Sequence, residues 1–204
     1  MPPWRGLAGT TVTQVWAKIM GAASGSKGAD QLTERPDAFH DQFVALFGHQ
    51  FQRLFRYLDR MTGEPELAAD LAQEAFIRLY RRGALPDVPE AWLVSVALNL
   101  FRNESSTRSR RRRLLTVTRG EASQADPPPA PDQVVMSREA GDEVRATLDQ
   151  MAERDRGLLL LWAEGYSYQD MAVALELNEA SVGTLLARAR RAFRETYGAA
   201  RDAS

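Results

Sequence analysis

The 204-residue sequence contains no cysteine and only two histidines, and no apolar run approaches the ~20 residues that cross a bilayer. Without cysteine, the chain can form neither disulfides nor thiolate metal sites. The N-terminus also lacks the charged start and the apolar core of a signal peptide. We therefore expect a cytoplasmic protein that is neither cross-linked by disulfides nor inserted in a membrane.

Recognisable catalytic motifs are absent as well. The sequence has no glycine-rich phosphate loop, no GxSxG motif and no paired metal-ligand spacing. His40 and His49 stand without cysteines or an HExxH pattern, so they are expected to be surface or packing residues. The sequence predicts a binding protein that is no enzyme and that has no catalytic residues, metal site or cofactor.

Basic charge is concentrated in two places, although the net charge of the whole chain is only −1. One cluster covers residues 108–113 and the other residues 188–194, and local concentration matters more than the total for binding nucleic acid. Apolar residues recur at helical spacing along most of the chain. We expect an all-α fold of two small helical domains joined by a flexible, proline-rich linker. The expected segments are a disordered tail (1–36), a first domain (37–113), the linker (114–134) and a second domain (135–198).

Three helices are predicted in the first domain. The first begins at Pro36-Asp37 and ends at Gly63, and the second covers about residues 64–82. The second should face inward with Leu67, Leu71, Ala75 and Leu79. Its outward face is predicted to carry Asp70, Gln73, Glu74 and Ile77.

The third helix starts at residues 87–90, where Asp87, Pro89 and Glu90 suit a helix N-terminus. Its buried side is predicted to hold Trp92, Leu93, Val96, Ala97 and Leu100. The other side carries Ser95, Asn99, Arg102 and Ser106, with Asn103 adjoining, and leads into the arginine cluster at 108–113. Such a face suits phosphates and base edges, and it is equally consistent with a solvated basic helix end.

The second domain is predicted to end in a helix-turn-helix at residues 165–197. Two helices, at about 135–151 and 152–164, precede it, and the run from Leu158 to Trp162 is expected to lie at the centre of the core. Ser167 and Asp170 have the spacing of a capping box, and Asn178 is a good N-cap for the final helix.

The final helix has two distinct faces. One face is predicted to pack inward with Val182, Leu185, Leu186, Ala189 and Phe193, and the opposite face carries Ser181, Thr184, Arg188 and Arg191. Short hydroxyls and arginines opposite a packed face are typical of a helix that binds the DNA major groove. The alternative is an ordinary helical hairpin whose arginines are solvated.

Two segments resemble the extracytoplasmic-function (ECF) sigma factors of bacterial RNA polymerase, which belong to the sigma-70 family. In the first, AADLAQEAFIRLYR is similar to the family's polymerase-binding helix (D-x-x-Q-E-x-F), and PEAWLVSVALNLFRN to its W-L-x-x-x-A-x-N. In the second, GYSYQDMA and SVGTLLARAR are similar to the family's G-Y-S-Y-x-E-I-A and T-V-x-x-x-L-x-R-A-R. The sequence departs from the family at Leu98, where arginine is common.

The resemblance implies a factor that directs RNA polymerase to promoters and assists promoter melting. Its implied partners are core polymerase and promoter DNA, and an anti-sigma factor is left open as a further partner. The implied core-polymerase site is Asp70, Gln73, Glu74 and Phe76. The implied minus-ten site is Trp92, Asn99, Arg102, Asn103 and Arg108, and the implied minus-thirty-five site is Ser181, Thr184, Arg188 and Arg191.

Two other functions are compatible with the same patterns. A free-standing two-domain helix-turn-helix regulator would bind its duplex without polymerase, usually as a dimer on a palindrome. A helical adaptor or anti-sigma-type protein would have no DNA role, which the arginine cluster at 108–113 argues against. Dependence of DNA binding on polymerase separates the sigma factor from the regulator.

Overall fold

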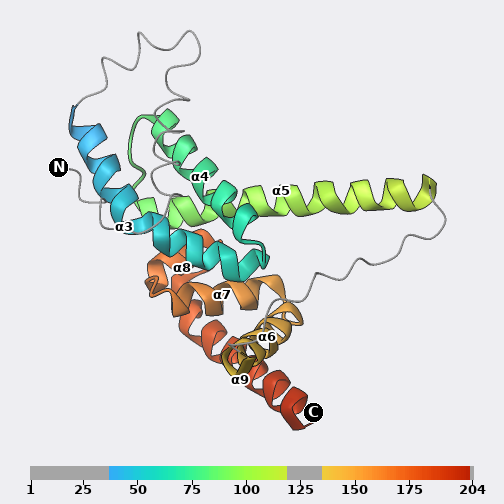
Figure 1. Ribbon diagram of the computed structural model, residues 1–204. Coiled ribbons are helices and arrows are strands. Elements are labelled where there is room, and N and C mark those ends of the chain that lie inside the picture. The colour runs from blue at the N-terminus through green and yellow to red at the C-terminus, as the bar shows by residue number, and fades with distance from the viewer. Residues whose placement is uncertain (1–36, 119–134, 203–204) are drawn as a thin grey trace.

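The computed structural model describes residues 37–118 and 135–202, and every regular element within these residues is an α-helix (Figure 1). This confirms the predicted all-α fold. The expected N-terminal tail and most of the expected linker lie outside the described residues. The helices are α3 (Asp37–Thr62), α4 (Pro65–Arg82), α5 (Pro89–Thr118), α6 (Val135–Asp149), α7 (Glu153–Ala163), α8 (Tyr168–Ala174) and α9 (Glu179–Asp202).

Helices α3, α4 and α5 form the N-terminal half, whose core contains a cluster of packed aromatic rings. Phe43, Phe47 and Phe51 are spaced by four residues, so their rings share the buried face of α3. From α4, Phe76 meets them edge-on, with its ring centroid 5.0 Å from that of Phe47 at an interplanar angle of 74°. Offset and edge-to-face contacts of this kind are the favoured geometries of aromatic rings.

Glycines end the first two helices of this half. Gly63 follows α3 with φ 70°, and Gly83 caps α4 with φ 75°, where its backbone N–H donates to the oxygen of Tyr80. The left-handed conformation is available to glycine without steric cost, so both helices stop where the sequence predicts. Helix α5 instead continues through Thr118, past the expected end at Arg113, because neither glycine nor proline interrupts residues 90–118.

Helices α6 to α9 form the C-terminal half, and its helix-turn-helix has the predicted caps. The Ser167 hydroxyl accepts a hydrogen bond from Asp170 N at 3.1 Å, and the Asp170 carboxylate accepts one from Ser167 N at 2.9 Å. Asn178 Oδ1 accepts from Ala180 N at 3.0 Å and caps α9. Both predicted caps are confirmed, and each gives a hydrogen-bond partner to a backbone N–H at the start of its helix.

One core prediction in this half is wrong. Leu158, Leu160 and Leu161 are buried, but Trp162 is 44% exposed. The α9 helix covers only part of α7, and Arg190 from α9 lies over the Trp162 ring at 4.6 Å from its centroid. The tryptophan therefore ends on the surface, where a cation covers one face of its ring.

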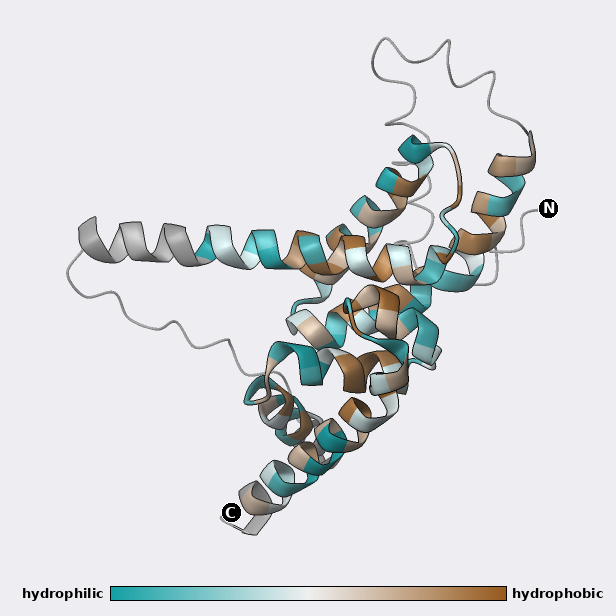
Figure 2. Cartoon of the chain, turned by 180° about the vertical axis from the view of Figure 1, so that it is seen from behind, coloured by the Kyte–Doolittle hydropathy of each residue, from teal (hydrophilic) through white to brown (hydrophobic). Residues whose placement is uncertain are grey.

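The two halves pack against each other. Helix α5 lies along α8 and α3 lies against α7, so the apolar side chains of both halves form one continuous buried cluster. In Figure 2, hydrophobic segments gather where the helices meet, and the described residues of α5 become hydrophilic as it projects away from the body. None of the helices within the described ranges has the length and apolar character that a membrane crossing requires.

Candidate nucleic-acid interface

The outer face of α9 carries the four side chains that the sequence assigns to DNA. Ser181, Thr184, Arg188 and Arg191 are all exposed. On the opposite face, the buried residues are Val182, Leu186 and Ala189, with Leu185 and Phe193 partly buried. The predicted separation of a packed face from a polar, basic face is confirmed.

The N-terminal part of α9 approaches α8 closely. A Cβ atom on Gly183 would lie 3.5 Å from Cε2 of Tyr168, which is ordinary van der Waals contact. The side chain of Tyr168 in α8 thus packs beside the backbone of α9 at this position. Ser181 and Thr184 stand on either side of it, at the end of α9 that a helix-turn-helix presents to base edges.

The second basic surface lies on α5, where the polar residues of the predicted site are exposed. Asn99, Arg102, Asn103 and Arg108 face outward, whereas Trp92 is only partly exposed and packs against the core. Two of these residues are close together, since Arg102 Nη1 lies 3.5 Å from Asn99 Oδ1. Leu98, the departure from the family pattern, is buried and contributes to the core.

Carboxylates already bind both arginines of the α5 surface. Arg102 Nε donates to Glu153 at 2.8 Å, and Arg108 Nη1 donates to both carboxylate oxygens of Glu64, at 2.7 and 2.8 Å. Arg108 also bonds Glu104 at 2.9 Å. The hydrogen bonds with Glu64 raise the pKa of the Arg108 guanidinium. A DNA phosphate would have to compete with these carboxylates for the same donors.

Helix α4 differs most from its predicted arrangement. Asp70 is exposed and Glu74, which pairs with Arg78 at 2.9 Å, is partly exposed. Gln73 and Ile77, predicted to face outward, are each only 8% exposed, so that prediction is wrong. Phe76 is fully buried among the α3 rings. Both α3 and α5 pack on α4, so only a narrow strip of the helix remains at the surface.

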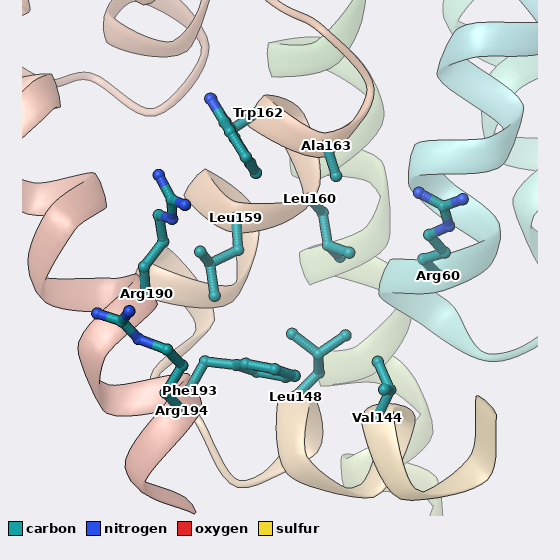
Figure 3. A pocket seen from close by; sticks show the side chains of 10 residues that line it. All are labelled: Arg60, Val144, Leu148, Leu159, Leu160, Trp162, Ala163, Arg190, Phe193 and Arg194. Atoms are coloured by element: carbon teal, nitrogen blue, oxygen red, sulfur yellow. The ribbon is translucent and has the colours of Figure 1, made fainter. Parts of the chain in front are cut away.

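A cavity of about 510 Å³ lies beside α7, and sequence reasoning did not identify it (Figure 3). Its lining combines apolar side chains with three arginines. The residues are Arg60, Val144, Leu148, Leu159, Leu160, Trp162, Ala163, Arg190, Phe193 and Arg194. Most come from α6, α7 and α9, and Arg60 comes from α3. Trp162 belongs to this lining, although the apolar run around it led the sequence analysis to place it in the core.

Comparisons with known proteins agree with this arrangement. Residues 46–113 match the family Sigma-70 region 2, and residues 141–193 match Sigma-70, region 4. The ECF RNA polymerase sigma factor SigL of Mycobacterium tuberculosis (strain Erdman) is 30% identical over 192 residues, which cover 87% of this chain and 96% of that protein. SigX of Bacillus subtilis is 29% identical over 163 residues, or 76% of this chain and 83% of SigX.

Another relative is longer than this chain. SigE of Mycolicibacterium smegmatis is 29% identical over 146 residues, and the matched part is 70% of this chain but only 56% of SigE. Among solved structures, the sigma factor RpoE of Bartonella quintana, in complex with the anti-sigma factor NepR, has a similar fold. The TM-score is 0.55 with 17% sequence identity, over 79% of this chain and 97% of RpoE. The chain belongs to the ECF sigma factors, the sigma-70-type proteins that confer promoter specificity in transcription initiation.

Proposed function

We propose that this chain directs bacterial RNA polymerase to promoters by dividing three tasks among α4, α5 and α9. The N-terminal half binds core polymerase and the melted minus-ten element, and the C-terminal half reads the minus-thirty-five element as duplex. The observation that carries the proposal is the outer face of α9, which is polar, basic and exposed on a helix whose other face is buried.

Position along α9 separates base contacts from phosphate contacts. Ser181 and Thr184 lie near the N-terminal end, where short side chains let the helix enter a major groove closely. Arg188 and Arg191 lie one to three turns further along, so they are placed to bind the phosphates that flank the groove. Sequence preference is expected from the first pair and general affinity from the second.

The α5 surface has the chemistry that a melted strand requires. Asn99 and Asn103 offer amide donors and acceptors to unpaired bases, and Arg102 and Arg108 offer guanidinium groups to phosphates. A base held outside the stack costs a few kcal/mol of unstacking, which aromatic and polar contacts offset. Trp92 is the aromatic candidate, and its partial burial limits it to contact through the exposed part of its ring.

Contact with polymerase is assigned mainly to the exposed strip of α4. Asp70 and Glu74 are accessible, and they are one turn apart on the same side of the helix. Gln73 and Phe76 are buried, so their proposed contribution is to hold that strip in position against α3 and α5. An anti-sigma factor remains a proposed further partner, because the structurally similar RpoE was solved with one.

Reconstitution with core polymerase tests the proposal. The chain should co-purify with core polymerase, and the reconstituted holoenzyme should initiate at discrete sites in run-off transcription on genomic DNA. The chain alone should bind the same promoters weakly. Tight binding of the chain alone to a palindromic duplex, with no retention on core polymerase, would instead identify a free-standing regulator.

A further inference from the structure

The cavity beside α7 has the size and the lining of a small-molecule site. Its volume of about 510 Å³ falls within the roughly 300–1,000 Å³ of cavities that bind small organic ligands. Apolar side chains from three helices form its wall, among them Leu148 of α6, Leu159 of α7 and Phe193 of α9 (Figure 3). An apolar ligand that enters the cavity would therefore be in contact with side chains on several sides.

Exposed apolar side chains gather at this cavity. Four large hydrophobic side chains are exposed among the described residues, and two of them, Val144 at 37% and Trp162 at 44%, belong to the lining. Exposed apolar surface that is concentrated in a hollow marks a binding site, whereas single exposed residues are common on any protein. A ligand that covers Val144 and Trp162 would remove this surface from water, which favours binding.

The charged part of the lining is entirely positive. Arg60, Arg190 and Arg194 line the cavity, and none of its lining residues is acidic. Arg60 is paired with Glu164, whose carboxylate lies 2.7 Å from Arg60 Nη1. Arg190 and Arg194 have no carboxylate within ion-pair distance among the described residues. Two uncompensated positive charges therefore border the apolar wall.

The contact of Arg190 with Trp162 leaves donors available for a ligand. The guanidinium carbon of Arg190 lies over the Trp162 ring, 4.6 Å from its centroid. A guanidinium above a ring can keep N–H groups at its edge for binding an anion. Arg194 follows Arg190 by four residues, so both side chains leave α9 on the same side. An anionic group between them would receive charge-assisted hydrogen bonds.

We propose that this cavity binds an amphipathic organic anion, with its apolar body against Leu148, Leu159 and Phe193 and its anionic group between Arg190 and Arg194. A long-chain carboxylate has this chemistry. The proposal adds a ligand site to the chain and does not depend on the proposed function. Because α9 also carries the proposed DNA-reading face, the ligand would bind to a different side of the helix that reads the upstream element.

Volume and charge distinguish this ligand from other occupants. Two turns of an α-helix, about 11 Å long and ~10 Å across, occupy roughly 850 Å³. This exceeds the 510 Å³ of the cavity, so a protein helix could place only side chains in it, whereas a small molecule can enter it whole. A cation of the same shape would lie beside two like charges, which repel it.

Calorimetric titration of the full-length chain with dodecanoate tests the site. The probe is used below its micelle-forming concentration and well above the pKa of its carboxyl group, so that it is a monomeric anion. One dodecanoate should bind per chain, with a Kd on the order of tens of micromolar. Dodecyltrimethylammonium has the same tail and the opposite charge, and it should bind about tenfold more weakly or less. Equal binding of the two probes would overturn the assignment of an anion.

Substitution of the two arginines isolates the anionic group. Arg190→Gln combined with Arg194→Gln should weaken dodecanoate binding about tenfold or more, because the carboxylate loses both sets of donors. The matched control is Arg81→Gln combined with Arg154→Gln, which removes the same charge from exposed positions outside the lining and should leave binding unchanged. An equal loss in both double variants would show a general electrostatic attraction and would contradict the site.

A charge-reversed variant guards against misfolding. Arg190→Glu combined with Arg194→Glu should lose dodecanoate and bind dodecyltrimethylammonium about tenfold more tightly than the wild-type chain does. A gain of this kind cannot arise from a damaged fold, and circular dichroism reports whether the helices are kept. Loss of dodecanoate without a gain of the cation, in a variant that keeps its helical spectrum, would count against the two arginines as the binding groups.

Retention on core polymerase identifies the other occupant. If dodecanoate does not bind the free chain, and Arg190→Gln with Arg194→Gln loses retention on core polymerase relative to its control, the cavity holds a polymerase segment and the small-molecule assignment is wrong. Promoter-dependent transcription by the wild-type chain tests the proposed function separately, since it requires no dodecanoate. Binding of dodecanoate by a chain that does not support transcription would uphold this site while the proposed function fails.

Discussion

The N-terminal half packs a cluster of aromatic rings among its aliphatic side chains, whereas the C-terminal half buries mostly aliphatic side chains and has side-chain caps on α8 and α9. Phe43, Phe47, Phe51 and Phe76 are buried together, on helices of 26 and 18 residues. The C-terminal half buries mostly aliphatic residues, and its α7 and α8 have only 11 and 7 residues. Helices this short are marginal alone, so the C-terminal half depends more on caps and on contact with its neighbour.

This difference suits the proposed tasks of the two halves. The packed rings of α3 and α4 support the helix that carries the proposed polymerase-binding strip. The C-terminal half meets its neighbour through the shared apolar cluster as well as through the ion pairs of Glu164 with Arg56 and Arg60. The following experiments test the comparison, in order of decreasing expected effect.

The largest effect is expected for removal of a ring from the N-terminal core. Phe76→Ala should lower the free energy of unfolding by about 3–5 kcal/mol, because it deletes a buried ring that contacts three others. Denaturant unfolding followed by circular dichroism measures the change. Arg81→Ala on the exposed side of the same helix is the control and should change stability by less than ~0.5 kcal/mol. If Phe76→Ala lowered the free energy of unfolding by less than ~1 kcal/mol, the packed aromatic rings would not be a main source of the stability of the N-terminal half.

Alkaline pH should weaken the contact between the halves. Burial raises the pKa of Tyr57 and of Tyr166 well above the ordinary value of ~10, so the folded protein retains phenol protons that the unfolded chain releases. Stability should therefore be constant below pH ~10 and fall above it, by up to about 1.4 kcal/mol per pH unit for each tyrosine.

Unfolding titrations at a series of pH values measure this effect. Around Tyr57 the other contributing groups are Tyr166, Glu153, Arg102 and Arg156, all of which keep their positions in the Tyr57→Phe variant. That variant should lose about half of the alkaline slope. An unchanged slope would mean that Tyr57 is already accessible to water and that the halves are not closed in solution.

Loss of a cap should affect the C-terminal half selectively. Ser167→Ala removes the hydroxyl of the capping box of α8 and should cost about 1 kcal/mol. Hydrogen exchange should show the loss in α8 and α9, with α3 and α4 unaffected. Gln169→Ala on the exposed side of α8 is the matched control and should leave exchange unchanged. Equal loss of protection in both halves would indicate that they unfold as one unit.

Promoter binding should separate two groups of residues on α9. Arg188→Ala should weaken binding across promoter sequences and reduce the salt slope by about one unit, because one phosphate contact is lost. Ser181→Ala or Thr184→Ala should instead change which bases are preferred in the upstream element. A panel of promoter variants, assayed with holoenzyme at two salt concentrations, distinguishes the outcomes. No effect from either class of substitution would show that α9 is not the reading helix.

We expect the smallest effect for the substitution of Asp70, a single exposed residue of the proposed polymerase-binding strip on α4. Asp70→Ala should weaken retention on core polymerase roughly fivefold, or ~1 kcal/mol, without changing the helical spectrum. Gln73→Ala is the informative comparison, since Gln73 is buried and its loss should lower stability first. Weaker retention by Gln73→Ala at unchanged stability would restore Gln73 as a direct contact.

Local sequence patterns predicted the C-terminal motif in detail. The capping box at Ser167, the N-cap at Asn178 and the two faces of α9 all agree with the structure, because caps and helical faces depend on residues within a few positions of one another. Prediction was less accurate for α4. Its periodicity correctly placed Leu71, Ala75 and Leu79 in the core, but it could not show that α3 and α5 would cover Gln73 and Ile77 as well.

The sequence by itself therefore determined the helices, most of their ends and the face that α9 presents to solvent, although α5 runs past its expected end. Tertiary structure decided the burial of Gln73, the exposure of Trp162 and the contact of the two halves through Glu164. The reason is physical. Hydrogen bonding and side-chain spacing within a helix are local, whereas Arg53 meets the backbone oxygen of Glu164 across 111 positions of sequence. No local pattern encodes such a contact, since it depends on how the completed helices pack.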